Sequence, residues 1–193
     1  LNMEFFGEKD GKPLVMNMIE TIAQNRAYLS EIDGEIGDGD HGVNMDKGFR
    51  LSKNKIENWE VGLSESLTEL GTALVMEVGG SMGPLYGSMF LDMGAEIAGK
   101  EKIDAAAFLG MLEAGYAGIK EIGEANVGDK TLVDTLHPAC GAFRSAHEAN
   151  EGCMASLLAM ETAAKKGRDS TKDLVAKVGR APRLGERSRG VLD

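Results

Sequence analysis

The sequence has few cysteines, no long apolar run and no excess of positive charge, and each shortage excludes a class of protein. Its two cysteines among 193 residues, Cys140 and Cys153, are too few for a disulfide framework and form no CxxC pair. No apolar run reaches the roughly 18 to 20 residues of a membrane span, and the first residues do not have the pattern of a signal peptide. Lys and Arg number 21 against 31 Asp and Glu, a net charge of −10, which argues against a nucleic-acid partner. We therefore expect a cytoplasmic protein with reduced thiols that binds neither nucleic acid nor a membrane.

Glycine, in contrast, is abundant: the 26 glycines are about twice the usual share of roughly 7%. They gather in four polar clusters, at 34–42, 79–83, 123–130 and 179–190. Between the clusters, apolar residues recur at steps of three and four, which is typical of amphipathic helices. The spacing predicts helices over 14–32, 43–57, 63–78, 84–97, 104–122, 131–147 and 152–178, the last interrupted near Gly167.

No stretch has the alternation of a strand, and β-branched residues are sparse. We therefore predict an all-α fold. The whole chain, 1–193, is expected to form one domain, in which 1–13 are an irregular N-terminal lead-in.

Two glycine clusters match nucleotide-binding motifs in part, but they lack the preceding strand that those motifs require. Residues 37–42 match GxGxxG, but a helix is predicted before them and two acids occupy the variable positions, so a dinucleotide fingerprint is rejected. Residues 123–131 resemble a P-loop with one extra residue before the lysine, and no strand precedes them. The acidic cluster also fails the spacing of an EF-hand.

Asp33, Asp38 and Asp40 fall within eight residues, with Glu35 beside them. Carboxylates this close repel one another unless a cation neutralises them. Their oxygens suit a hard ion such as Mg²⁺. A solvated turn in which the aspartates cap helices is the alternative, and we favour the metal site.

Two further features suit an anion. The small residues 79–83, just before a predicted helix start, could present backbone N–H groups to phosphate, although a plain helix connection has the same composition. Four arginines, which could pair with phosphate or form a solvated basic tail, follow near the end of the chain: Arg180, Arg183, Arg187 and Arg189.

Four linked motifs resemble one family in order and approximate spacing: Asp33 followed by GDGDHG and Asn44, then GGSMGPLYG, GDKTLVD and GRAPRLGERS. From about residue 17 to Asp193 the chain resembles the nucleotide-binding L subunit of the dihydroxyacetone kinases. The resemblance implies an antiparallel barrel of about eight amphipathic helices with the nucleotide at one rim. The family continues past this point with Pro-Gly and a final helix, so the last helix of the barrel is expected to be missing.

The resemblance also implies the ligands, which are ADP or ATP with two Mg²⁺ ions. Asp33, Asp38 and Asp40 would hold the metal ions, and no side chain would act as a nucleophile. The implied nucleotide-binding residues are His41, Gly42, Val43, Asn44, Gly80, Ser81, Met82, Gly123, Leu132, Arg180 and Asp193.

By this resemblance the chain is a kinase subunit that is active only with partners. A separate subunit holds dihydroxyacetone, and a phosphohistidine-carrying subunit of the phosphotransferase system rephosphorylates ADP in place. An ATP-exchanging subunit of a related ketose or tetrulose kinase is one alternative. A non-catalytic nucleotide-sensing module that binds a transcription regulator is another, and a homodimer is also expected as a candidate assembly. The nucleotide domain of a fatty-acid kinase ranks last, because it requires a long C-terminal extension.

Overall fold

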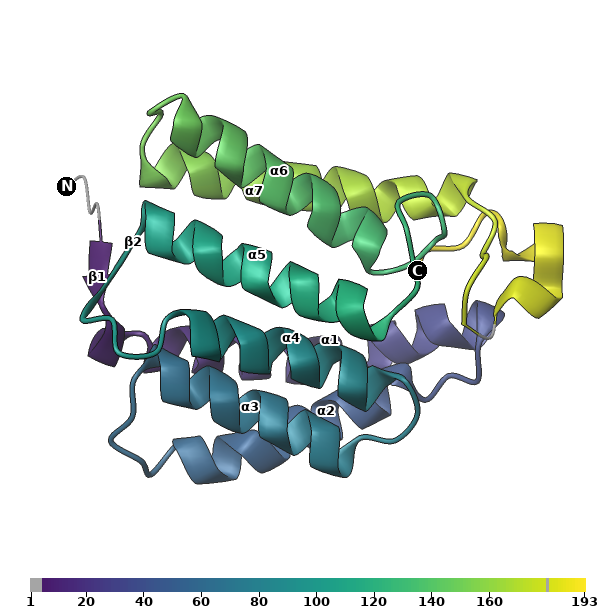
Figure 1. The fold of residues 1–193 in the computed structure, drawn as a ribbon. Coiled ribbons are helices and arrows are strands. Elements are labelled where there is room, and N and C mark those ends of the chain that lie inside the picture. Colours follow the sequence, from purple (N-terminus) through teal and green to yellow (C-terminus); the bar gives the residue numbers. More distant parts are fainter. Residues whose placement is uncertain (1–4, 180) are drawn as a thin grey trace.

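The computed structural model describes residues 5–179 and 181–193, most of which lie in helices (Figure 1). The α-helices of this part of the chain are α1 (Lys12–Ile36), α2 (His41–Ile56), α3 (Leu63–Glu77), α4 (Met82–Glu96), α5 (Ala105–Ile122), α6 (Val133–Glu148) and α7 (Cys153–Ser170). Three short 3-10 helices accompany them: η1 (Glu8–Asp10), η2 (Thr171–Asp173) and η3 (Ala181–Ser188). The predicted all-α class is confirmed.

Local sequence explains where several of these helices begin. Asp104 precedes α5, and its carboxylate accepts the backbone N–H of Ala107 at 2.8 Å, as expected of an N-cap. Pro13 lies in the first turn of α1, where its missing N–H costs no hydrogen bond. The predicted helix over 43–57 is confirmed as α2, which begins two residues earlier.

The last long helix is shorter than the predicted range 152–178, because α7 ends at Ser170 and η2 follows. The hydroxyl of Ser170 donates to the carbonyl of Gly167, and that of Thr171 donates to the carbonyl of Arg168, both at 2.6 Å. Side chains that bond to nearby carbonyls compete with the helical pattern. The apolar periodicity alone therefore overestimated the length of this helix.

The predicted interruption near Gly167 is wrong, since α7 runs through this residue. A Cβ atom at Gly167 would lie 2.3 Å from the carbonyl oxygen of Asp134 on α6. Glycine is needed here because the two helices approach closely, and it does not end the helix.

The lead-in expected to be irregular contains a short strand within its described part. Strand β1 (Phe5–Gly7) pairs antiparallel with β2 (Lys102–Asp104), and Phe6 lies opposite the buried Ile103. Both strands are only three residues long, so neither could produce the alternating pattern by which strands are detected in a sequence. The expectation of no strand needs this correction.

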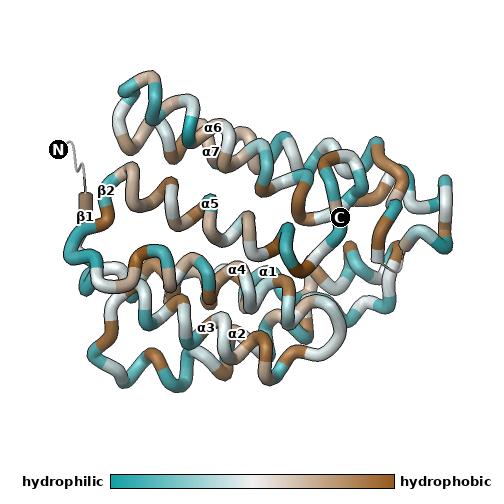
Figure 2. The backbone as a smooth tube through the Cα atoms, viewed as in Figure 1, coloured by the Kyte–Doolittle hydropathy of each residue, from teal (hydrophilic) through white to brown (hydrophobic). Residues whose placement is uncertain are grey.

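Consecutive helices pack against one another in antiparallel pairs, with hydrophobic positions distributed along each helix (Figures 1 and 2). Phe49 of α2 meets Phe90 of α4 edge to face, with ring centroids 5.9 Å apart. Phe143 of α6 is fully buried and lies 5.3 Å from the ring of Phe108 on α5. The first contact lies within the α1–α5 core, and the second joins this core to the α6–α7 pair.

The antiparallel order brings the α1–α2, α3–α4 and α5–α6 connections to one end of the bundle, where the C-terminal segment also lies (Figure 1). Three of the four glycine clusters belong to these connections, and the fourth belongs to the C-terminal segment. Among the described helices, none is both long and apolar enough to cross a membrane.

Candidate nucleotide and metal site

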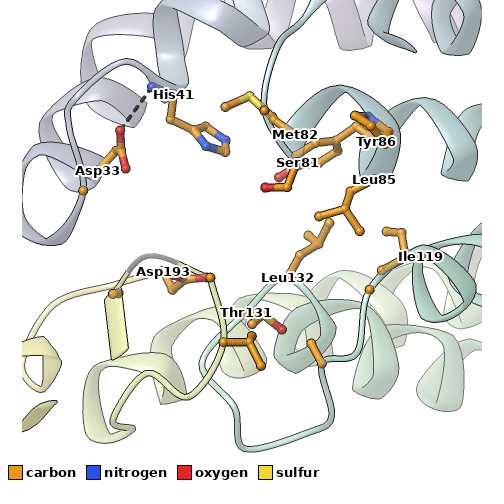
Figure 3. Close-up of a pocket in the computed structure, with 18 of the residues that line it drawn as sticks. Asp33, His41, Ser81, Met82, Leu85, Tyr86, Ile119, Thr131, Leu132 and Asp193 are labelled. Atoms are coloured by element: carbon orange, nitrogen blue, oxygen red, sulfur yellow. Dashed lines mark hydrogen bonds between the residues drawn. The ribbon is translucent and has the colours of Figure 1, made fainter. Parts of the chain in front are cut away.

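A cavity of about 840 Å³ opens where these connections meet. Its walls come from segments far apart in the sequence: 33–44, 79–86, 119–125, 130–133, 178–179 and the residues 181 and 193. Figure 3 shows Asp33 and His41 on one side of this space, with Leu132 and Ile119 across from them. The fold therefore joins all four glycine clusters in a single site.

Three carboxylates form an acidic cluster at one wall of this cavity. Asp33 lies in the last turn of α1, Asp38 lies in the connection, and Asp40 immediately precedes α2. One oxygen from each lies within 4.8 Å of those of the other two. Carboxylates so close repel strongly in the absence of a cation. The arrangement fits a hard divalent ion such as Mg²⁺, which oxygen ligands favour.

His41 connects the acidic cluster to the neighbouring wall. Its backbone N–H donates to Oδ2 of Asp33 at 3.2 Å, and its ring lies edge-on to Tyr86 with centroids 6.1 Å apart (Figure 3). Burial lowers the pKa of His41 below its usual value, although Asp33 and Asp40 both act to raise it. At neutral pH the ring is therefore uncharged and can bond to a ligand or water without adding positive charge.

The first turns of α2 and α4 both line the cavity. Gly80, before α4, has φ of +71°, a left-handed conformation that glycine adopts without strain. This turn leads through Ser81 into the helix start. The first N–H groups of a helix have no intrahelical partner, and they lie at the positive end of the helix dipole. Two such helix starts beside the acidic cluster suit a metal-bound phosphate.

The opposite wall is apolar. The side chains of Leu85, Ile119 and Leu132 lie together there, contributed by α4, α5 and the residue before α6 (Figure 3). Ile122 and Val133 also line the cavity. An apolar wall facing a charged one suits a ligand with a flat hydrophobic group at one end and phosphates at the other.

Two ionisable groups complete the cavity. Burial, and then the charge of Asp193, raises the pKa of Tyr86 to about 12, so its hydroxyl stays protonated and can donate to an anion. Removal from water raises the pKa of the Asp193 carboxyl to about 6; Lys130 acts against this shift, and Asp134 and Asp33 add to it.

Most of the site residues predicted from the sequence are brought together in this cavity. Those that line it are Asp33, Asp38, Asp40, His41, Asn44, Gly80, Ser81, Met82, Gly123, Leu132 and Asp193. Their roles toward a nucleotide stay predictions.

Three other predicted residues are placed differently. Gly42 is buried against α1, where a Cβ atom would lie 1.9 Å from the carbonyl oxygen of Arg26. Val43 is 44% exposed, and neither residue is among the described residues that line the cavity. Arg180 lies outside the described residues. The structure thus gives Gly42 a packing reason that the motif alone did not reveal.

The other arginines of the basic segment, Arg183, Arg187 and Arg189, are not among the described lining residues either. Arg189 pairs with Glu186, with Nε and Oε2 3.0 Å apart. For Arg189 the structure therefore shows a local ion pair at the surface.

Sequence analysis missed several residues of the walls, chiefly Leu85, Tyr86, Ile119, Lys130 and Thr131. Leu85 and Tyr86 follow the predicted Met82 by three and four residues, so helical spacing could have identified them. Ile119 was read as part of an apolar helix face, and periodicity does not distinguish a cavity wall from a core.

The chain is similar to proteins of one known family. The family model of the DAK2 domain matches residues 35–193. The chain is 35% identical over 196 residues to the "PEP-dependent dihydroxyacetone kinase 2, ADP-binding subunit DhaL" of Listeria innocua, covering 100% of this chain and 88% of that protein. It is 39% identical over 175 residues to the "PTS-dependent dihydroxyacetone kinase, ADP-binding subunit DhaL" of Lactococcus lactis, covering 90% of this chain and 83% of that protein.

A solved structure has the same fold. The crystal structure of the dihydroxyacetone kinase from C. freundii, in complex with AMP-PNP and Mg²⁺, superposes with a TM-score of 0.67 at 23% identity. The match covers 92% of this chain and 30% of that one, so this chain spans about a third of the solved kinase.

Proposed function

Because the chain belongs to the DAK2 domain family, we propose that it is the nucleotide-binding subunit of a dihydroxyacetone kinase. It would hold ADP or ATP with two Mg²⁺ ions and transfer the phosphoryl group to dihydroxyacetone on a separate subunit. In the form we favour, ADP stays bound and a phosphohistidine-carrying subunit of the phosphotransferase system rephosphorylates it. The printed names of the Listeria and Lactococcus relatives, PEP-dependent and PTS-dependent, support this donor.

One observation supports the proposal most directly. The carboxylate oxygens of Asp33, Asp38 and Asp40 lie within 4.8 Å of one another, in a cavity that also contains two helix starts and an apolar wall. A metal ion, a phosphate chain and a base each have a matching surface there.

In this proposal, some residues of the cavity would position the nucleotide, and others would hold the ions that neutralise its charge. The three aspartates would hold the Mg²⁺ ions, and the start of α4 after Ser81 would orient the phosphates through backbone N–H groups. The ring of His41 would contact the phosphates from the other side of the cavity. The apolar wall would fix the base and exclude water from one side of the site. Bound Mg²⁺ supplies the charge neutralisation that phosphoryl transfer requires. No side chain of the cavity is needed as a nucleophile.

The first test is to identify small molecules released when the purified chain is denatured. We expect ADP in close to stoichiometric amount, retained through dialysis and lost when Mg²⁺ is chelated. Release of nothing, followed by binding of added ATP, would instead support the ATP-exchanging form. Failure to bind either nucleotide in the presence of Mg²⁺ would refute the proposal.

A second test addresses the reaction. The chain is combined with a dihydroxyacetone-binding subunit and a phosphohistidine donor, and dihydroxyacetone phosphate is measured. Product should form with the wild-type chain and not with Asp38→Ala, whereas a control at the neighbouring exposed acid, Glu35→Gln, should stay active. Tight nucleotide binding without product would instead favour the nucleotide-sensing module.

A further inference from the structure

A lysine beside the cavity is buried almost completely. Lys130 is 1% exposed and lies in the connection between α5 and α6, although lysine is rarely buried unless its ammonium group is paired. Its backbone has φ of +63°, a conformation uncommon outside glycine. Both the burial of this charge and the unfavourable backbone conformation cost free energy, so other contacts must offset that cost.

The contacts of its ammonium group offset this cost. Lys130 Nζ donates to the carbonyl of Thr171 in η2 at 2.6 Å and to the carbonyl of Val191 at 2.5 Å. One ammonium group thus joins the α5–α6 connection, the residue after α7 and the segment Val191–Asp193. The other two pieces of chain lie 41 and 61 residues from Lys130 in the sequence.

Two further hydrogen bonds join the C-terminal segment to η2. The backbone N–H of Asp193 donates to Oγ1 of Thr171 at 3.0 Å, and that of Gly190 donates to the carbonyl of Lys172 at 2.7 Å. The C-terminal segment is therefore attached to η2 at both ends of the Lys130 contact.

The connection that carries Lys130 is itself held in place by Asp134. The buried carboxylate of Asp134 accepts hydrogen bonds from backbone N–H groups of this connection. Its Oδ1 accepts from Gly128 at 2.5 Å and its Oδ2 from Thr131 at 2.9 Å. The connection is thereby held in the conformation that directs Lys130 toward η2. A lysine whose donors are engaged by backbone carbonyls acts on the position of the chain, whereas one that binds phosphate directs them to the ligand.

We propose that Lys130 is a positioning residue, which fastens Val191–Asp193 to η2 so that Asp193 faces the cavity, and that nucleotide affinity depends on this attachment. The inference rests on the proposed function for its ligand, and its structural part can be tested without a nucleotide.

The test uses Lys130→Met, which keeps the length of the side chain and removes the donors, and Lys130→Arg, which restores them. Hydrogen exchange of peptides covering 186–193 is followed by mass spectrometry without nucleotide, and the affinity for ADP with Mg²⁺ is measured by calorimetry. The chain offers a matched control: Lys12 on α1 also donates to two backbone carbonyls, those of Glu57 and Trp59, at 3.0 and 2.7 Å. Lys12 is not among the described residues of the cavity wall.

In Lys130→Met we expect faster exchange in 186–193 and weaker ADP binding. If the segment holds its attached position in about a tenth of the molecules, the apparent Kd rises about tenfold. Lys130→Arg should restore most of the slow exchange and most of the ADP affinity. Lys12→Met should change neither quantity. Unchanged exchange in Lys130→Met would overturn the attachment, and faster exchange with unchanged ADP affinity would overturn its role in binding.

The inference stays testable if Lys130→Met does not fold or if the wild-type chain binds no ADP. If Lys130→Met fails to fold, Thr171→Val tests the same attachment by removing the acceptor for the Asp193 N–H; it should speed exchange at Asp193 and weaken ADP binding, and no change in either would overturn the inference. If the wild-type chain binds no ADP, the proposed function fails, and the exchange measurement still decides whether Lys130 holds the segment.

Discussion

Replacing Asp40 by Asn should stabilise the metal-free chain and, at the same time, remove most of its stabilisation by Mg²⁺ and ADP. The substitution keeps the shape of the side chain, and Asn is as good a residue as Asp before a helix. It changes the charge of the acidic cluster and little else. The two effects have opposite sign, so a general loss of stability cannot imitate them.

The size of the first effect follows from the geometry. The three carboxylate oxygens lie within 4.8 Å of one another. Two unit charges at that distance repel by about 0.9 kcal/mol in water and about 3.5 kcal/mol at an effective dielectric constant of about 20. Asp38 and Asp40 are exposed, so the lower figure applies, and Asp40→Asn removes two of the three repulsions. The expected gain is roughly 1–2 kcal/mol, or about 2–8 °C in Tm for a chain of this size.

The assay is thermal unfolding in EDTA and again in Mg²⁺ with ADP. A ligand at about 100 times its Kd stabilises by about 2.7 kcal/mol, which should raise the wild-type Tm and leave that of Asp40→Asn nearly unchanged. Asp40→Asn should therefore have the higher Tm in EDTA, and the wild type should have the higher Tm in Mg²⁺ with ADP. Glu35→Gln removes a neighbouring exposed charge outside the cluster; it should stay within about 0.5 kcal/mol of wild type in EDTA and keep the ligand effect.

A lower Tm for Asp40→Asn in EDTA would refute the reasoning that the aspartates repel one another in the metal-free chain. An equal gain from Mg²⁺ and ADP in both proteins would refute the assignment of Asp40 to the metal site. The first result is visible in the pair of melting curves in EDTA, and the second requires the pair in Mg²⁺ with ADP as well.

Three further predictions concern the acidic cluster, a close helix contact and the two cysteines. Asp38→Ala should abolish Mg²⁺-dependent nucleotide binding in calorimetry while circular dichroism reports unchanged helix content; retained affinity would contradict the site. Gly42→Ala should cost about 2–3 kcal/mol in urea unfolding, because its Cβ would lie 1.9 Å from a carbonyl oxygen of α1. Gly141→Ala, where the added carbon would meet no atom of another part of the described chain within 4 Å, should cost nothing. Burial raises the pKa of Cys140, so iodoacetamide should label the less buried Cys153 first; equal labelling rates would contradict that burial.

The acidic cluster could be predicted from the sequence because its members are close along the chain. Asp33, Asp38 and Asp40 lie within eight residues at the end of α1 and in the connection that follows it, so they stay near one another whichever way the helices pack. The helices could be predicted for a similar reason, since an amphipathic period is a local property. Local rules failed where contacts between distant segments decided the outcome, as in the pairing of β1 with β2. The apolar period also ran past Ser170, where side-chain bonds to nearby carbonyls end α7.

The rest of the site depends on tertiary structure. Leu85, Ile119 and Leu132 form one wall only because α4, α5 and the start of α6 meet at the same end of the bundle. Nothing near Lys130 in the sequence indicates that its partners are Thr171 and Val191. The sequence by itself determined which residues could bind a metal ion and which segments are helical, since both depend on neighbours along the chain. Only the packing of the helices decided which apolar residues face the cavity and which buried charge fastens the C-terminal segment, because those contacts join residues that are far apart in the sequence.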